Sequence, residues 1–184
     1  MNKLFASAIF AASILSSNSV FAQVSVGSAT GQLNLTATAS ANCTGLSFAP
    51  TGVDFSGAIN TINNTQQAFG PVGVAGGTIT CNFSGAKLGL KTQNGGLTLN
   101  GAQNTPSSPV PHIPYTATPA WAPLTIPVNP LVAVEAGGFE TNDTVGANPN
   151  GALSISLSVA PNPSNVLPVG SYQDVLLINV GAGF

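Results

Sequence analysis

The chain has 184 residues, of which 43% are hydrophobic and only 4% are charged, for a formal net charge of −2. An average soluble protein has about 25% charged residues. Three basic side chains argue against nucleic-acid binding, which needs clustered Lys and Arg. One His and two Cys argue against a His/Cys metal cluster. Disorder is also disfavoured, because disordered chains combine low hydrophobicity with high net charge.

The N-terminus has the pattern of a secretory signal. Lys3 gives a short basic start, residues 4–15 are an apolar run, and the stretch ends on a small residue at Ala22. A membrane span needs about 20 apolar residues, so this run is too short to be an anchor. We therefore predict a signal peptide over residues 1–22, a mature chain that begins at Gln23, and no membrane span in the mature chain.

Export makes the two cysteines informative. Cys43 and Cys81 are the only cysteines of the chain. In an oxidising compartment they are expected to form one disulfide, and two free buried thiols are the alternative. Closing a loop of this size stabilises the folded state by about 4 kcal/mol in the chain-entropy model.

The hydrophobic pattern predicts an all-β fold. Residues 33–39, 88–92 and 152–159 alternate apolar with polar side chains, which is the period of a strand with one face on a core. Gly- and Asn-rich turn signals, such as Asn100-Gly101 and Asn150-Gly151, separate these segments. Many short strands of this kind favour a sandwich or a barrel.

A proline-rich stretch over residues 105–130 differs from the rest. Because proline cannot donate to a central ladder, we expect loop or sheet edge here. Tyr115 and Trp121 either hold this connection on the core, which we favour, or belong to an exposed binding loop. His112 is interpreted as a loop residue and not as a catalytic base, since no nucleophile motif accompanies it.

The C-terminal segment carries the most specific motif. Gly170, Tyr172 and Asp174 form Gly-x-Tyr-x-Asp, and an alternating strand with Leu176, Ile178 and Val180 follows. This resembles the last strand of the spore coat protein U domain family, the pilins of archaic chaperone–usher systems. Residues 41–43, 53–57 and 77–81 resemble other pieces of that family in the same order. The proline-rich middle is not matched, and residues 181–184 extend the family's usual finish.

The resemblance implies a function. Members of this family have an immunoglobulin-like sandwich that lacks its last strand. A periplasmic chaperone fills the resulting groove, and an outer-membrane usher exchanges it for the N-terminal strand of another subunit. We accordingly expect an exported structural subunit of a surface pilus or coat-like fibre, built from copies of this chain or related subunits. An enzyme activity, a cofactor or a nucleic-acid partner is not expected.

The resemblance also divides the mature chain. Residues 23–42 are the candidate extension and residues 43–184 the pilin-like domain. The alternating apolar side chains of the extension are the candidate partner-strand residues: Leu33, Leu35, Ala37 and Ala39.

Three alternatives stay open. In the first alternative, residues 33–39 are the domain's own first strand. In the second, the chain is a self-complete secreted β-sandwich that serves as a coat or binding domain. The third is a small outer-membrane β-barrel, because apolar residues alternate back from Phe184; the few Tyr and Trp residues argue against it.

Overall fold

The computed structural model describes residues 21–25, 32–36 and 40–183, and these form two compact units, Met1–Ser40 and Ala41–Phe184. Apart from its last two residues, the predicted signal peptide lies outside the described residues. In the N-terminal unit, β1 (Phe21–Ser25) pairs antiparallel with β2 (Gln32–Thr36). The C-terminal unit contains all the other elements.

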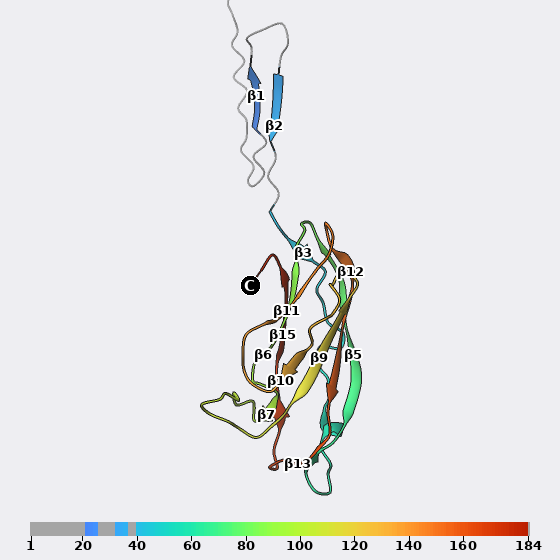
Figure 1. The fold of residues 1–184 in the computed structure, drawn as a ribbon, viewed down its shortest axis with the longest axis vertical. Helices are drawn as coiled ribbons and strands as arrows, with labels where there is room; N and C mark the ends of the chain where they lie inside the picture. The colour runs from blue at the N-terminus through green and yellow to red at the C-terminus, as the bar shows by residue number, and fades with distance from the viewer. Residues whose placement is uncertain (1–20, 26–31, 37–39, 184) are drawn as a thin grey trace, which may run out of the picture. The chain divides into compact units, whose positions relative to one another are not determined.

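Thirteen strands and one short 3₁₀ turn make up the described part of the C-terminal unit (Figure 1). In chain order they are β3 (Cys43–Thr44), η1 (Ser56–Ala58), β4 (Thr65–Gln66), β5 (Phe69–Cys81), β6 (Lys87–Thr92), β7 (Leu97–Leu99), β8 (His112–Ile113), β9 (Tyr115–Trp121), β10 (Leu131–Ala133), β11 (Glu140–Asp143), β12 (Asn150–Val159), β13 (Asn162–Val166), β14 (Tyr172–Gln173) and β15 (Leu176–Gly181).

The strands form several antiparallel sheets. The largest has the order β10-β9-β12-β5-β3, and a second has the order β11-β6-β15. Smaller sheets pair β13 with β4 and place β7 between β14 and β8. The prediction of an all-β fold is thus confirmed. No helix in the described part of the chain is long and apolar enough to cross a membrane.

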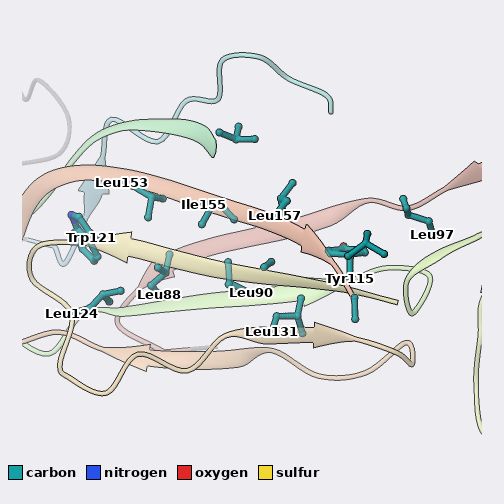
Figure 2. Packing of buried hydrophobic residues seen from close by; sticks show 14 of the residues in the cluster. Leu88, Leu90, Leu97, Tyr115, Trp121, Leu124, Leu131, Leu153, Ile155 and Leu157 are labelled. Carbon is teal, nitrogen blue, oxygen red and sulfur yellow. The ribbon is translucent and has the colours of Figure 1, made fainter. Parts of the chain in front are cut away.

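One hydrophobic core serves both larger sheets. Leu153, Ile155 and Leu157 are the inward residues of β12, and Leu88 and Leu90 are those of β6. Figure 2 shows these side chains gathered in one cluster with others from β9 and β10. The alternation seen in residues 152–159 therefore reflects burial of one face of β12, as the period of two predicts.

The expectation for the proline-rich stretch is wrong for β9. This strand lies inside the largest sheet, between β10 and β12, and contains Pro119. β10 pairs with β9 only at residues 115–117 of the latter, so Pro119 lies beyond the end of β10. A strand tolerates proline there because the neighbour that would need its N–H is missing on that side.

The aromatic residues of this stretch hold it on the core. Trp121 and Tyr115 are each 4% exposed. The indole Nε1 of Trp121 donates to the carbonyl of Gly151 at 3.0 Å, which satisfies its one polar group. Both residues therefore lie on the core, as the favoured interpretation predicts, but they belong to strand β9 and not to a connection.

The predicted disulfide is also present. Cys43 on β3 is bonded to Cys81 at the end of β5, and the two residues are direct partners in the β3–β5 register. The bridge therefore joins β3, the edge strand of the largest sheet, to its neighbour β5.

Candidate functional site

An open apolar groove of about 860 Å³ runs along the C-terminal unit between the two larger sheets. Its lining comes from segments far apart in the sequence. β5 and β12 contribute Val74, Ile155 and Leu157 from one sheet, and β15 contributes Leu176 and Ile178 from the other. Further lining residues are Leu46, Phe48, Val53, Phe55, Ile59, Leu97, Ile113, Tyr115, Tyr172 and Asp174.

One wall of this groove is a strand with an unpaired edge. β15 pairs with β6 from Leu176 opposite Thr92 to Gly181 opposite Lys87. It stands at the end of the sheet order β11-β6-β15, so its other edge has no ladder partner among the described residues. An edge of this kind presents N–H and C=O groups that can pair with another strand.

The opposite wall is the segment from Leu46 to Phe55, which follows β3. Two backbone hydrogen bonds, from Ser47 N to the carbonyl of Gly76 and from Ala49 N to the carbonyl of Ala75, attach it to β5, each at 3.1 Å. Phe55 at the end of the segment packs against the ring of Phe69, with a centroid distance of 5.1 Å. The segment is therefore fixed on its β5 side.

One of the lining residues, Asp174, has a carboxylate whose two oxygens accept four hydrogen bonds. Asp174 Oδ1 accepts from the backbone N–H groups of Asn94 at 2.8 Å and Val175 at 2.7 Å. Its Oδ2 accepts from the Tyr115 hydroxyl at 2.9 Å and from the Thr92 hydroxyl. With four donors, this carboxylate has the number of partners that its two oxygens can use. The carboxylate therefore has a structural role, in which it holds neighbouring segments together.

Two tyrosines that line the groove have raised pKa values, so their hydroxyl groups stay protonated. Burial raises the pKa of Tyr115 well above its usual value, and the charge of Asp174 adds to the effect because it disfavours a second negative charge nearby. Burial also raises the pKa of Tyr172. The Tyr172 hydroxyl donates to the carbonyl of Pro168 at 2.9 Å. Both tyrosines therefore act as hydrogen-bond donors.

The structure brings most of the predicted last-strand motif to this groove. Gly170, Tyr172, Asp174, Leu176 and Ile178 all line it. Val180, further along β15, is half-buried and packs against the core. The expected single strand is divided, however, because Tyr172 and Gln173 pair with β7, whereas β15 pairs with β6. The bonds that Asp174 accepts hold the chain at this change of sheet.

The candidate partner-strand residues lie elsewhere. Leu33 and Leu35 lie on β2 in the N-terminal unit, and Ala37 and Ala39 lie outside the described residues. β2 pairs with β1, in which Phe21 is opposite Thr36 and Ala22 is opposite Leu35. Phe21 and Ala22 are the last residues of the predicted signal. Cleavage before Gln23 would thus remove the partners of Leu35 and Thr36.

Sequence reasoning did not identify the far side of the groove. Leu46 and Phe48 carry no pattern that marks them as lining residues, because their segment is too irregular to show a period of two. Leu97 and Ile113, from the short strands β7 and β8, were missed for the same reason. The only signal in the sequence is the concentration of Phe48, Val53 and Phe55 around Asp54, which is the single charged residue between Lys3 and Lys87.

No site for a metal emerges from the described residues, in which no three His, Cys, Asp or Glu side chains lie close enough together to hold an ion. The Lys87–Asp143 ion pair, at 2.9 Å, is on the surface and joins β6 to β11.

Comparison with protein-family models, curated proteins and solved structures finds no significant match.

Proposed function

We propose that this protein is an exported structural subunit that polymerises by strand donation into a surface pilus or coat-like fibre. The observation that carries the proposal is the open apolar groove beside the unpaired edge of β15. In this interpretation the C-terminal unit is an immunoglobulin-like sandwich without its last strand. A neighbouring subunit supplies that strand, and a periplasmic chaperone covers the groove until an outer-membrane usher exchanges it.

The hydrogen bond from Tyr172 supports the sandwich assignment. A tyrosine near the start of a late strand, bonded to a backbone carbonyl a few residues upstream, is a feature of immunoglobulin-like domains. Here the acceptor is the carbonyl of Pro168, four residues earlier.

The dimensions of the groove suit the candidate donor. β15 has six residues, which corresponds to about 20 Å of strand. The seven residues 33–39 would span about 23 Å and present Leu33, Leu35, Ala37 and Ala39 on one face. Burying the leucines would contribute roughly 1.5–3 kcal/mol each. The compact C-terminal unit begins at Ala41, which supports donation by this segment over a role as the domain's first strand.

Substitution of Leu33 by Asp tests the proposal. A charge on the inserted face is costly to bury, so the variant should accumulate with its chaperone but form no fibres in electron micrographs. Asn34→Asp is the matched control, because it adds the same charge to the opposite face of the strand. Normal fibres from Leu33→Asp would contradict donation by this segment. Failure to accumulate even with chaperone would show that the segment is the domain's own strand.

A mixing experiment separates donor from acceptor. Ile178→Asp should damage the groove but leave the extension intact. Mixed with Leu33→Asp, which keeps an intact groove, it should form a complex with one copy of each chain that grows no further. Two chains that stay separate would argue against strand donation. A wild-type chain that stays monomeric without any chaperone would instead indicate a self-complete secreted domain.

A further inference from the structure

A cluster of exposed apolar side chains lies at one end of the C-terminal unit. Ile62 is 93% exposed, Val169 is 90% exposed and Val166 is 67% exposed. Val166 is paired with Thr65 in the β13–β4 ladder, and Leu167 N donates to the carbonyl of Asn64 at 2.7 Å, so the loops that carry these residues are neighbours. We call Ile62, Val166 and Val169 the end patch.

The end patch has two properties of a contact surface. No charged residue occurs between Asp54 and Lys87 or between Asp143 and Asp174, so neither loop carries a charge that would have to be desolvated. Gly170, which follows Val169, lines the groove. The patch is thus continuous with the site that receives the donated strand in the proposed function.

The chain's own extension leaves from the opposite end. Asn82 N donates to the carbonyl of Asn42 at 3.0 Å beside the Cys43–Cys81 bridge. The loop after Cys81 leads into β6 at Lys87, which is opposite Gly181 at the end of β15. The extension therefore departs where β15 ends, whereas the end patch lies beyond Tyr172 and Leu176, where the C-terminal motif begins.

The short link between the candidate donor residues and Cys43 requires the C-terminal unit of the donor to lie close to that of the acceptor. Cys43 lies four positions after Ala39, the last candidate donor residue, so the two are joined by four residue steps. They span at most about 14 Å. The donor's body must consequently lie at one mouth of the acceptor's groove. The acceptor's own extension departs at the Gly181 end of β15, which leaves the groove end beside the end patch for the neighbour in a repeating, head-to-tail fibre.

We propose that the end patch seats the Cys43 end of a second copy of this chain, as a body-to-body contact additional to strand donation. The Cys43 end carries apolar side chains to meet it: Val145 is 58% exposed and Ile126 is 93% exposed. They flank paired segments at that end, where Val145 N donates to the carbonyl of Pro123 and Thr144 N to that of Ala86. The inference rests on the proposed function.

Cross-linking of assembled full-length chains tests the contact. Val169→Cys places a thiol on the end patch, and Ser84→Cys places one on the exposed loop beside Cys81. With a short bis-maleimide, fibres of the double variant should give a ladder of covalent multimers on a denaturing gel. The control is Val132→Cys with Ser84→Cys, because Val132 is 54% exposed on the edge strand β10 and is not part of the end patch. It should yield at least tenfold less multimer.

The outcomes distinguish the two proposals. Fibres that form normally but give no ladder, or that give an equal ladder with the control, would overturn the end contact and leave strand donation intact. A wild-type chain that forms no fibres would overturn the proposed function and this inference with it. Ile62→Asn combined with Val169→Asn provides an independent measurement. Its fibres should dissociate faster than the wild type in dilute denaturant, and equal rates would also overturn the contact.

Discussion

Replacement of Asp174 by Asn should destabilise the C-terminal unit through two hydroxyl groups. The amide oxygen of Asn can still accept from the backbone N–H groups of Asn94 and Val175. Its NH₂ group, however, replaces the oxygen that accepts from Tyr115 and Thr92. Those two partners would then face a donor where they now face an acceptor.

Thr92 cannot adapt to this change. Its hydroxyl oxygen already accepts from the N–H groups of Gly95 at 2.9 Å and Gly96 at 3.2 Å, so both lone pairs are used. The Thr92 hydroxyl must therefore donate, and it has lost its acceptor. Tyr115 can turn to accept a hydrogen bond, but then its own buried hydrogen has no partner.

The expected loss is about 3 kcal/mol. A hydrogen bond to a charged group contributes about 1.5–3 kcal/mol, and we use the lower value twice because Asp174 is only half-buried. With a urea dependence of about 2 kcal/mol per M, this lowers the unfolding midpoint by about 1.5 M. The single tryptophan, Trp121, is buried and reports unfolding by its fluorescence in dilute, monomeric solution.

Asp54→Asn is the matched control. The Asp54 carboxylate accepts from Ser56 N at 2.8 Å on the surface, and an amide oxygen can do the same, so the change should be within about 0.5 kcal/mol. If Asp174→Asn has the same urea unfolding midpoint as the wild type, the conclusion that the Thr92 hydroxyl can only donate to residue 174 is wrong. If the variant has normal stability and assembly but loses a measurable turnover, the structural role of Asp174 is wrong as well.

Two further predictions concern the disulfide and pH. Alkylation of the exported protein without reductant should add no label by intact mass, whereas two labels would contradict the Cys43–Cys81 bridge; its removal should cost roughly 2–5 kcal/mol. Because the pKa of Tyr115 is raised in the folded state, its contribution to stability is complete below pH of about 10 and declines as the pH rises further. Tyr115→Phe should therefore show a weaker loss of stability between pH 10 and 12 than the wild type, and equal slopes would refute this.

Local periodicity explains why parts of the fold were predictable. β12 buries one face along most of its length, so its alternation is visible in the sequence. Pro119 shows where such reasoning fails. Whether a proline is tolerated depends on how far the neighbouring strand β10 extends, and this is fixed by tertiary pairing that no local pattern records.

The same limit applies to the candidate site. Alternation in residues 170–180 predicts a strand with one inward face, because β15 turns every second side chain toward the core, where it is half-buried. The other wall, from Leu46 to Phe55, is irregular and is held by backbone bonds from Ser47 and Ala49, which any residue except proline can make. A wall defined by backbone pairing leaves no signature in side-chain order.

The distribution of the few charges distinguishes the two edges of the sheet β11-β6-β15. Natural proteins protect exposed edge strands with charged residues. β11, at one edge, begins and ends with Glu140 and Asp143, two of the five acidic residues of the chain. β15, at the other edge, has no charged residue, and none follows Asp174. A uniformly low charge content would leave both edges equally bare. Protection of one edge and not the other is instead what a sheet requires when only its β15 side is to receive a further strand.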